Sequence, residues 1–220
     1  MSTLDQVGKG RFTDKTSDIH NYCVKYEKYL PLKRYDKMNI LEIGVLNGYS
    51  LHMWKDYYYL SNVVGIDIDP KCKIHEGGGR VNVEIGSQDD EPFLLSVVEK
   101  YGAFDFIVDD GSHMNSHVIK SFEVLFPTMK SGGVYAIEDC GTSYWEGWEG
   151  GYLKETTMIE YFKRLSDDVN FRGLMNFNMP NVHARREDWL IDLSHETQPD
   201  CRTDIESITF LNGIIIIIKR

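Results

Sequence analysis

Residues 207–220 read SITFLNGIIIIIKR, and this stretch decides how the chain folds. Asn212-Gly213 is the strongest short signal for a β-hairpin, because both residue types tolerate the positive φ angles of a tight turn. The arm that follows is continuously aliphatic, which is typical of a strand buried on both faces. We therefore predict a terminal hairpin whose second strand lies inside a sheet and not at its edge.

Upstream of the hairpin, short apolar segments alternate with stretches of helical spacing. The predicted strands are residues 38–43, 63–68, 81–85, 104–108 and 134–137, and the predicted helices are residues 17–30, 49–60, 90–101, 115–129 and 154–166. This alternation indicates a doubly wound α/β fold with a mostly parallel sheet of seven strands, hairpin included. We expect one domain over residues 1–220, with a helical cap in 1–36, a loop in 141–151 and an irregular insertion in 168–204.

Composition argues against several classes of function. The formal net charge of −10 opposes binding to nucleic acid, which needs a basic face, and Arg185-Arg186 is the only candidate for one. The longest aliphatic run, residues 214–218, is far shorter than the roughly 20 residues that span a bilayer. The N-terminus lacks a secretory signal, and the cysteines form no CxxC pair of a zinc site. We expect a cytoplasmic protein with no nucleic-acid or membrane partner.

Residues 41–50 (LEIGVLNGYS) join the first sheet strand to a helix. Gly44 allows a tight turn and a close approach to a ligand, and Glu42 offers a carboxylate to an ammonium group. Asp67 ends the next strand, where an acid accepts hydrogen bonds from ribose. The acid at the first strand end favours S-adenosylmethionine over a dinucleotide. The predicted cofactor-binding residues are Glu42, Gly44, Asn47, Ser50, Asp67, Ser87, Gln88 and Asp109.

Two of these assignments leave alternatives open. Ser87 and Gln88 follow the third strand and suit contacts to an adenine, but a helix cap by Ser87 or Asp89 would give the same spacing. Asp69 is the alternate to Asp67 as the ribose acid.

Four carboxylates follow the fourth and fifth strands: Asp109, Asp110, Glu138 and Asp139. Neighbouring parallel strands end at the same edge of the sheet, and four like charges there are unfavourable unless a cation compensates them. A hard divalent ion with oxygen ligands, Mg²⁺ or a similar ion, fits this set. We predict Asp110, Glu138 and Asp139 as ligands, whereas Asp109 is placed to orient a methyl donor. The alternative is that some of these acids cap helices or remain solvated.

His113 lies three residues after Asp110 on the same loop. An imidazole accepts protons near neutral pH, and a cation-bound alcohol is more acidic than a free one. We therefore predict His113 as the general base of an alkylation reaction, and we interpret His117, one helical turn further on, as structural.

These motifs together resemble the metal-dependent sugar O-methyltransferases of macrolide biosynthesis, of the mycinamicin and demethylmacrocin type. The matching segments are TDKTSDIHNYCVKYEKYLPL, LEIGVLNGYSLHMW, GIDIDP, VDDGSH, SFEVLFPTMKSGGVYAIED and TSYWEG, within about residues 10–150. The resemblance implies a class I methyltransferase fold, magnesium at Asp110 and Asp139, and His113 as base. It also places the segment from Thr13 to Lys15, followed by His20 and Tyr22, near the mouth of the site.

The resemblance has departures. The residues before Thr13 read GKGRF where relatives usually have a tyrosine–glycine approach, and larger members carry an added N-terminal domain. The acceptor is therefore expected to differ, or to be recognised across the subunit interface of a homo-oligomer.

The expected function is methyl transfer from S-adenosylmethionine to a hydroxyl of a sugar or glycoside, with Thr142, Tyr144 and Trp145 lining the acceptor pocket. Two alternatives remain open. One is a methyltransferase for catechols or phenols, and the other is a non-catalytic, cofactor-binding component of a hydroxylase-like complex.

Overall fold

The computed structural model describes residues 2–31, 33–170 and 204–220, and it places a seven-stranded sheet at the centre of the molecule, in the order β3-β2-β1-β4-β5-β7-β6. The strands are β1 (Asn39–Ile43), β2 (Asn62–Asp67), β3 (Val81–Ile85), β4 (Phe106–Asp109), β5 (Val134–Ile137), β6 (Ile205–Leu211) and β7 (Ile214–Lys219). The first five are parallel, and β7 is antiparallel to both of its neighbours. The predicted doubly wound fold with a terminal hairpin is confirmed.

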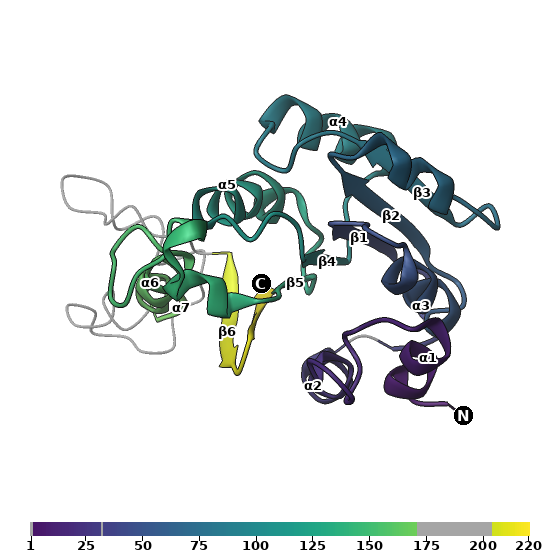
Figure 1. Ribbon diagram of the computed structural model, residues 1–220, viewed down its shortest axis with the longest axis horizontal. Helices are drawn as coiled ribbons and strands as arrows, with labels where there is room; N and C mark the ends of the chain where they lie inside the picture. The colour runs from purple at the N-terminus through teal and green to yellow at the C-terminus, as the bar shows by residue number, and fades with distance from the viewer. Residues whose placement is uncertain (1, 32, 171–203) are drawn as a thin grey trace, which may run out of the picture.

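Helices cover both faces of this sheet (Figure 1). The α-helices are α1 (Leu4–Arg11), α2 (Tyr22–Tyr29), α3 (Tyr49–Tyr57), α4 (Glu91–Tyr101), α5 (Asn115–Leu125), α6 (Met158–Arg164) and α7 (Ser166–Val169). One apolar core packs α4, α5 and α6 against the sheet through side chains such as Leu94, Phe122 and Phe162. A second core packs α1, α2 and α3 against the other face and includes Tyr26 and Trp54. None of the helices in the described ranges is long and apolar enough to span a membrane.

The hairpin behaves as its sequence predicts. Gly213 has a φ of 79°, and the buried β7 pairs with β5 on one side and with β6 on the other. The aliphatic run from Ile214 is buried because both faces of β7 lie under the helical layers. β7 therefore lies directly beside β5, and Glu138 and Asp139 follow the end of β5.

The predictions differ from the structure mainly outside the sheet. The helix α1 lies in the helical cap predicted over 1–36, although its bounds were not predicted; Thr3 caps it, with its hydroxyl accepting from the Gln6 amide. The helix predicted over 17–30 begins only at Tyr22, because Asn21 adopts a left-handed φ of 59°. The segment predicted as loop contains two short 3₁₀ helices, η3 (Cys140–Tyr144) and η4 (Glu146–Trp148), and two others, η1 (Pro70–His75) and η2 (Phe126–Thr128), occur elsewhere.

The insertion predicted over 168–204 is only partly covered. Its first residues belong to the end of α7, while residues 171–203, with Arg185-Arg186, lie outside the described residues.

Candidate active site

A cavity of about 600 Å³ lies at the carboxyl ends of the parallel strands, which is within the usual range for ligand sites. Of the residues predicted from sequence, its wall contains Gly44, Asn47, Ser50, Asp67, Ser87, Gln88, Asp110, His113 and Asp139. Glu42, Asp109 and Glu138 are buried just beneath this wall. The sheet edge therefore gathers the predicted cofactor and metal residues around one space.

The turn after β1 fits tightly against the end of β4. Gly44 has a φ of 90°, and a Cβ atom added to it would lie 2.1 Å from the backbone oxygen of Asp110. No residue with a side chain can occupy this position without moving one of the two strand ends. Gly44 therefore allows the end of β1 to lie directly against the loop that follows β4.

Asp67 holds the same turn by its carboxylate. Oδ2 accepts hydrogen bonds from the amides of Val45 (2.8 Å) and Leu46 (3.1 Å), and Oδ1 accepts from the amide of Asp69 (2.8 Å). Burial opposes ionisation, but these three backbone donors outweigh it and lower the pKa of Asp67. Asp69 instead caps η1 through the amide of Lys71 (2.9 Å). The contact from Asp67 to a ribose stays a prediction.

Gln88 and Asp109 form a buried polar pair under the cavity. The Gln88 amide group donates to Asp109 Oδ1 (3.1 Å), and its oxygen accepts from the amide of Ser112 (2.6 Å). Asp109 also accepts from Ser121 Oγ (2.5 Å) and from the Tyr135 hydroxyl (3.2 Å). Burial raises the pKa of Asp109 to about 6 despite these donors. This network holds the loop that carries Asp110 and His113; the proposed contact of Asp109 to a methyl donor stays a prediction.

Ser87 makes a short contact of its own. Its hydroxyl donates to the carboxylate of Asp89, and Asp90, not Ser87 or Asp89, caps α4 by accepting from the amide of Phe93 (3.2 Å). The alternative in which Ser87 or Asp89 caps the helix is therefore wrong.

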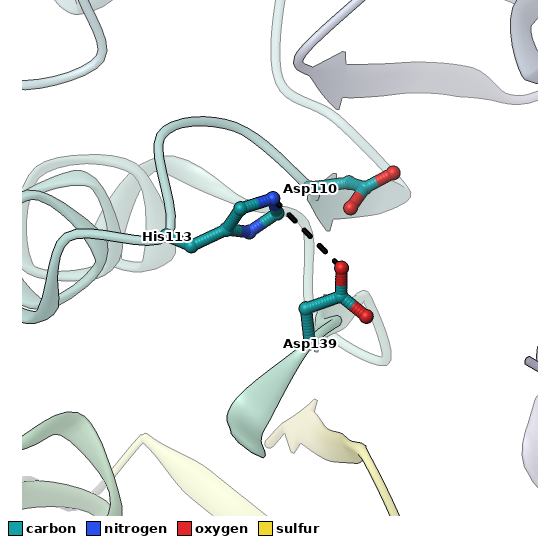
Figure 2. Close-up of side chains that lie close together, drawn as sticks. All are labelled: Asp110, His113 and Asp139. Carbon is teal, nitrogen blue, oxygen red and sulfur yellow. Dashed lines mark ion pairs between the residues drawn. The ribbon is translucent and has the colours of Figure 1, made fainter. Parts of the chain in front are cut away.

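Asp110, His113 and Asp139 form a compact group, in which one potential ligand atom from each lies within 4.8 Å of the others (Figure 2). His113 Nε2 lies 3.8 Å from Asp139 Oδ2. Both His113 and Asp139 have left-handed backbones, with φ of 58° and 51°. Non-glycine residues adopt this conformation at a cost of about 1–3 kcal/mol, and they are frequent at functional sites. Tyr22 fixes Asp139 by donating to its Oδ1 at 2.7 Å.

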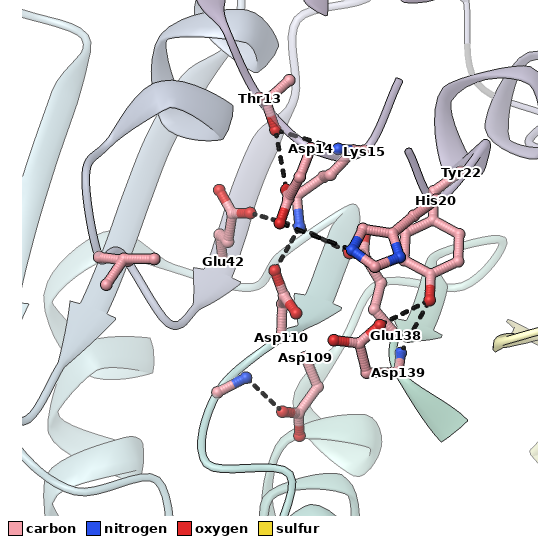
Figure 3. Close-up of polar contacts among 12 residues, drawn as sticks. Thr13, Asp14, Lys15, His20, Tyr22, Glu42, Asp109, Asp110, Glu138 and Asp139 are labelled. Atoms are coloured by element: carbon pink, nitrogen blue, oxygen red, sulfur yellow. Dashed lines mark hydrogen bonds and ion pairs between the residues drawn. The ribbon is translucent and has the colours of Figure 1, made fainter. Parts of the chain in front are cut away.

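Lys15 lies in the middle of the carboxylates, as Figure 3 shows. Its Nζ is 2.5 Å from Asp110 Oδ2, 2.6 Å from Glu138 Oε2 and 3.4 Å from Glu42 Oε1. The second oxygen of Glu138 accepts from the Tyr26 hydroxyl at 2.5 Å. Burial raises the pKa of Glu138 to about 8, although Lys15 opposes this. Glu138 thus has both oxygens bonded to protein groups and stands outside the three-residue group; its role as a metal ligand stays a prediction.

Glu42 is completely buried at the end of β1. Lys15 Nζ lies 3.4 Å from its Oε1, but neither oxygen accepts a hydrogen bond among the described residues, and burial raises its pKa to about 7. A buried carboxylate without donors is unfavourable and indicates a place for a missing donor group.

A second cavity of about 350 Å³ adjoins the first through Asp139. Its wall includes Thr142 and Trp145, together with His20 and Tyr22, whose stacked rings have centroids 5.3 Å apart. Asn212 and Gly213 of the hairpin turn also line it. Tyr144 is 51% exposed and does not belong to this wall as the structure describes it. The sequence predicted two of these residues as acceptor contacts, and the resemblance placed His20 and Tyr22 near them.

No family model matches the chain, but individual proteins do. Demethylmacrocin O-methyltransferase of Streptomyces fradiae is 35% identical over 181 residues, which cover 78% of this chain and 45% of that enzyme. Mycinamicin VI 2''-O-methyltransferase of Micromonospora griseorubida is 37% identical over 201 residues, 82% of this chain and 50% of that enzyme. The chain thus spans about half the length of the curated relatives it matches.

A solved structure agrees with the sequence relatives. The MycE methyltransferase of the mycinamycin biosynthetic pathway, in complex with Mg and SAH, superposes with a TM-score of 0.82 at 28% identity, covering 99% of this chain and 54% of that one. The chain belongs to the class I methyltransferase fold family. Within that family it is a relative of the macrolide sugar O-methyltransferases, as its motifs indicated.

Proposed function

We propose that this protein is an S-adenosylmethionine- and Mg²⁺-dependent O-methyltransferase that acts on a hydroxyl of a sugar or a glycosylated small molecule. The observation that carries the proposal is the group of Asp110, His113 and Asp139, which lines the larger cavity and reaches the smaller one through Asp139. The names of the relatives, all sugar or glycoside O-methyltransferases, support it. So does the solved complex of MycE with Mg, SAH and mycinamycin VI.

The larger cavity fits the cofactor. Glu42 provides a buried carboxylate that accepts no hydrogen bond among the described residues, even from Lys15 at 3.4 Å, and so it has room for the ammonium group of a methionyl moiety. Gly44, Asn47 and Ser50 would hold that end of the cofactor, and Asp67, Ser87 and Gln88 would contact the nucleoside. When bound, S-adenosylmethionine supplies an electrophilic methyl group.

The acidic group fits a divalent cation. Asp110 and Asp139 offer the carboxylate oxygens that Mg²⁺ prefers, and we retain Glu138 as a third candidate ligand. A bound cation makes a coordinated hydroxyl more acidic.

His113 is the base in this proposal. Its imidazole lines the larger cavity beside Asp139, which lines both cavities, and it receives the proton that the acceptor hydroxyl loses on methylation. Asp139, 3.8 Å away, stabilises the imidazolium that results. Thr142 and Trp145 line the space for the acceptor, and the indole offers an apolar surface to a sugar ring. Tyr144, exposed beside this space, is a further acceptor contact in our proposal.

Three broader assignments belong to the proposal as well. We propose a cytoplasmic location, a single domain over residues 1–220, and a homo-oligomer in which a neighbouring subunit completes acceptor recognition. Size-exclusion chromatography with light scattering tests the oligomer directly.

The decisive experiment measures methyl transfer from labelled S-adenosylmethionine to a panel of glycosides, nucleotide sugars, catechols and phenols, with and without EDTA. Label transferred to a glycoside only when Mg²⁺ is present supports the proposal. Transfer to catechols alone would replace it with the phenol-type alternative. Cofactor binding by calorimetry that neither requires a metal nor yields a product would favour the non-catalytic alternative.

A further inference from the structure

Lys15 is a buried cation to which the proposed reaction gives no role. Its side chain is 1% exposed, and its ammonium contacts acids at the ends of three strands: Glu42 in β1, Asp110 after β4 and Glu138 after β5. The residue itself belongs to none of these strands, because it lies between α1 and α2. One side chain from outside the sheet therefore joins three of its strand ends.

The position of this ammonium is set by the backbone around it. The carbonyl of Lys15 accepts a hydrogen bond from the Cys23 amide at the start of α2 (2.8 Å). The carbonyl of Thr16 accepts from the Asn21 amide (2.8 Å), and the Thr13 amide donates to Gly8 in α1 (3.3 Å). These contacts anchor the segment at both ends without any ion. Lys15 is thus a permanent part of the site.

Two of the carboxylates that contact Lys15 are also candidate ligands of the divalent ion. Lys15 bonds one oxygen of Asp110, which belongs to the three-residue ligand group, and one oxygen of Glu138, the third candidate ligand. Buried carboxylates need a compensating positive charge, which either an ammonium or a metal ion provides. An ammonium and a divalent ion at adjoining oxygens also repel each other, strongly so where water is excluded.

We propose that Lys15 is the resident counter-cation of this site and a positioning residue that competes with the divalent ion for Asp110 and Glu138, which weakens ion binding. The inference rests on the proposed function, because it takes the cation site from it. Lys15 keeps the acids together when the ion is absent, and its charge lowers the affinity when the ion binds.

The test compares Mn²⁺ binding, by calorimetry without cofactor or acceptor, in the wild type and three variants. Lys15→Met keeps the length of the side chain and removes its charge, so it should bind Mn²⁺ at least about tenfold more tightly. Lys15→Arg keeps the charge and should stay near the wild-type affinity. Lys9→Met is the matched control, because Lys9 lies on α1 and its side chain is 40% exposed. Equal or weaker binding by a folded Lys15→Met protein would overturn the inference.

A measurement on the wild type covers the case in which Lys15→Met does not fold. The ammonium protons of Lys15 should be visible by NMR in the metal-free protein, since burial slows their exchange with water. Saturating Mg²⁺ should shift this signal and leave the backbone amide signal of Lys9 in place; an unchanged Lys15 signal would contradict competition. If neither the wild type nor any variant binds Mn²⁺, the cation site of the proposed function fails together with the inference. If all bind it equally, only the inference fails.

Discussion

The two ends of the large cavity stabilise their carboxylates in opposite ways. At the β2 end, Asp67 accepts three backbone amides, and its pKa is lowered. At the β5 end, Glu138 is buried between Lys15 and Tyr26, and burial raises its pKa to about 8. Backbone dipoles thus satisfy one acid, whereas the other depends on side chains from distant parts of the chain.

Because of this difference, the Asp67 end of the cavity is preformed, whereas the acidic end needs a bound cation. The backbone around Gly44 and Asp67 is fixed by local hydrogen bonds and needs no ligand to hold its shape. The group at Asp110 and Asp139 concentrates negative charge and needs a cation for full compensation. We therefore expect cofactor binding and cation binding to respond to different substitutions, and the following variants test that separation.

The largest effect is expected for His113→Ala. Loss of a general base lowers turnover roughly 10²- to 10⁴-fold, while affinity for the cofactor product should change less than about threefold, because the imidazole does not shape the Gly44 turn. Labelled methyl transfer and calorimetry measure the two quantities. His52→Ala removes an imidazole outside both cavities and serves as the control. Full turnover in His113→Ala would remove His113 from the mechanism.

Gly44→Ala should affect the other end of the cavity, at the turn after β1. The added Cβ meets the backbone oxygen of Asp110 at 2.1 Å, and the positive φ adds strain, so we expect a loss of roughly 3–5 kcal/mol from stability and cofactor binding together. Urea unfolding and calorimetry divide the loss between them. Gly10→Ala, at a glycine of α1 with no atoms within 4 Å of an added Cβ, should cost nothing. A Gly44→Ala protein of normal stability and affinity would show that the turn tolerates movement.

The sheet and one end of the site could be predicted from sequence because they depend on local patterns. Strands 81–85 and 134–137 were predicted with the bounds that the structure shows, since apolar runs between polar turns mark buried strands. Gly44 follows such a strand directly and Asp67 lies at the end of another, so the topology alone brings them to the cavity. The residues that matter at this end all stand at a fixed distance from a predicted strand.

The other end could be predicted only in part. Asp110 and Asp139 follow their strands, but Lys15 belongs to a polar segment whose pattern gives no sign of burial. Its contacts bridge 95 positions to Asp110 and 123 to Glu138, and no local periodicity reports such pairs. The only signal was the resemblance of the Thr-Asp-Lys segment to a known family. Asp109 is buried and Asp110 is accessible because side chains at the end of a strand point alternately to opposite sides. The sequence does not show which of the two is buried, since the predicted end of a strand is uncertain by a few residues.

The pH dependence of stability should distinguish the two kinds of acid. The pKa of Asp109 rises from 3.8 to about 6 on burial, so the folded state binds more protons than the unfolded state between these values. Its contribution therefore lowers stability by roughly 3 kcal/mol as the pH increases from about 4 to 6. Asp109→Asn should flatten this decline in urea unfolding at several pH values.

Asp67 supplies the matched comparison with the opposite sign. Its lowered pKa means that it stabilises the fold above its ordinary value of 3.8 and that this stabilisation is lost as the pH falls. Asp67→Asn should therefore reduce stability at neutral pH and little at acidic pH. If both variants changed the pH profile in the same direction, the contrast between the two ends of the cavity would be wrong.

The smallest effect is expected for Tyr22→Phe, which removes a hydroxyl that donates to the Asp139 carboxylate and accepts from the Asp139 amide at 3.3 Å. The Tyr22 hydroxyl donates to Asp139 Oδ1 at 2.7 Å and so holds the carboxylate in place. Without this hydroxyl, the free energy of Mn²⁺ binding should become less favourable by about 1 kcal/mol, which corresponds to a roughly fivefold weaker affinity. Tyr29→Phe on the same helix is the control, because Tyr29 lines neither cavity. Cofactor affinity should be unchanged in both variants, since Asp67 and Gly44 are untouched. A Tyr22→Phe protein that loses cofactor affinity but keeps its affinity for Mn²⁺ would show that the two ends of the cavity are coupled through Asp139. Cofactor binding and cation binding would then not respond to different substitutions.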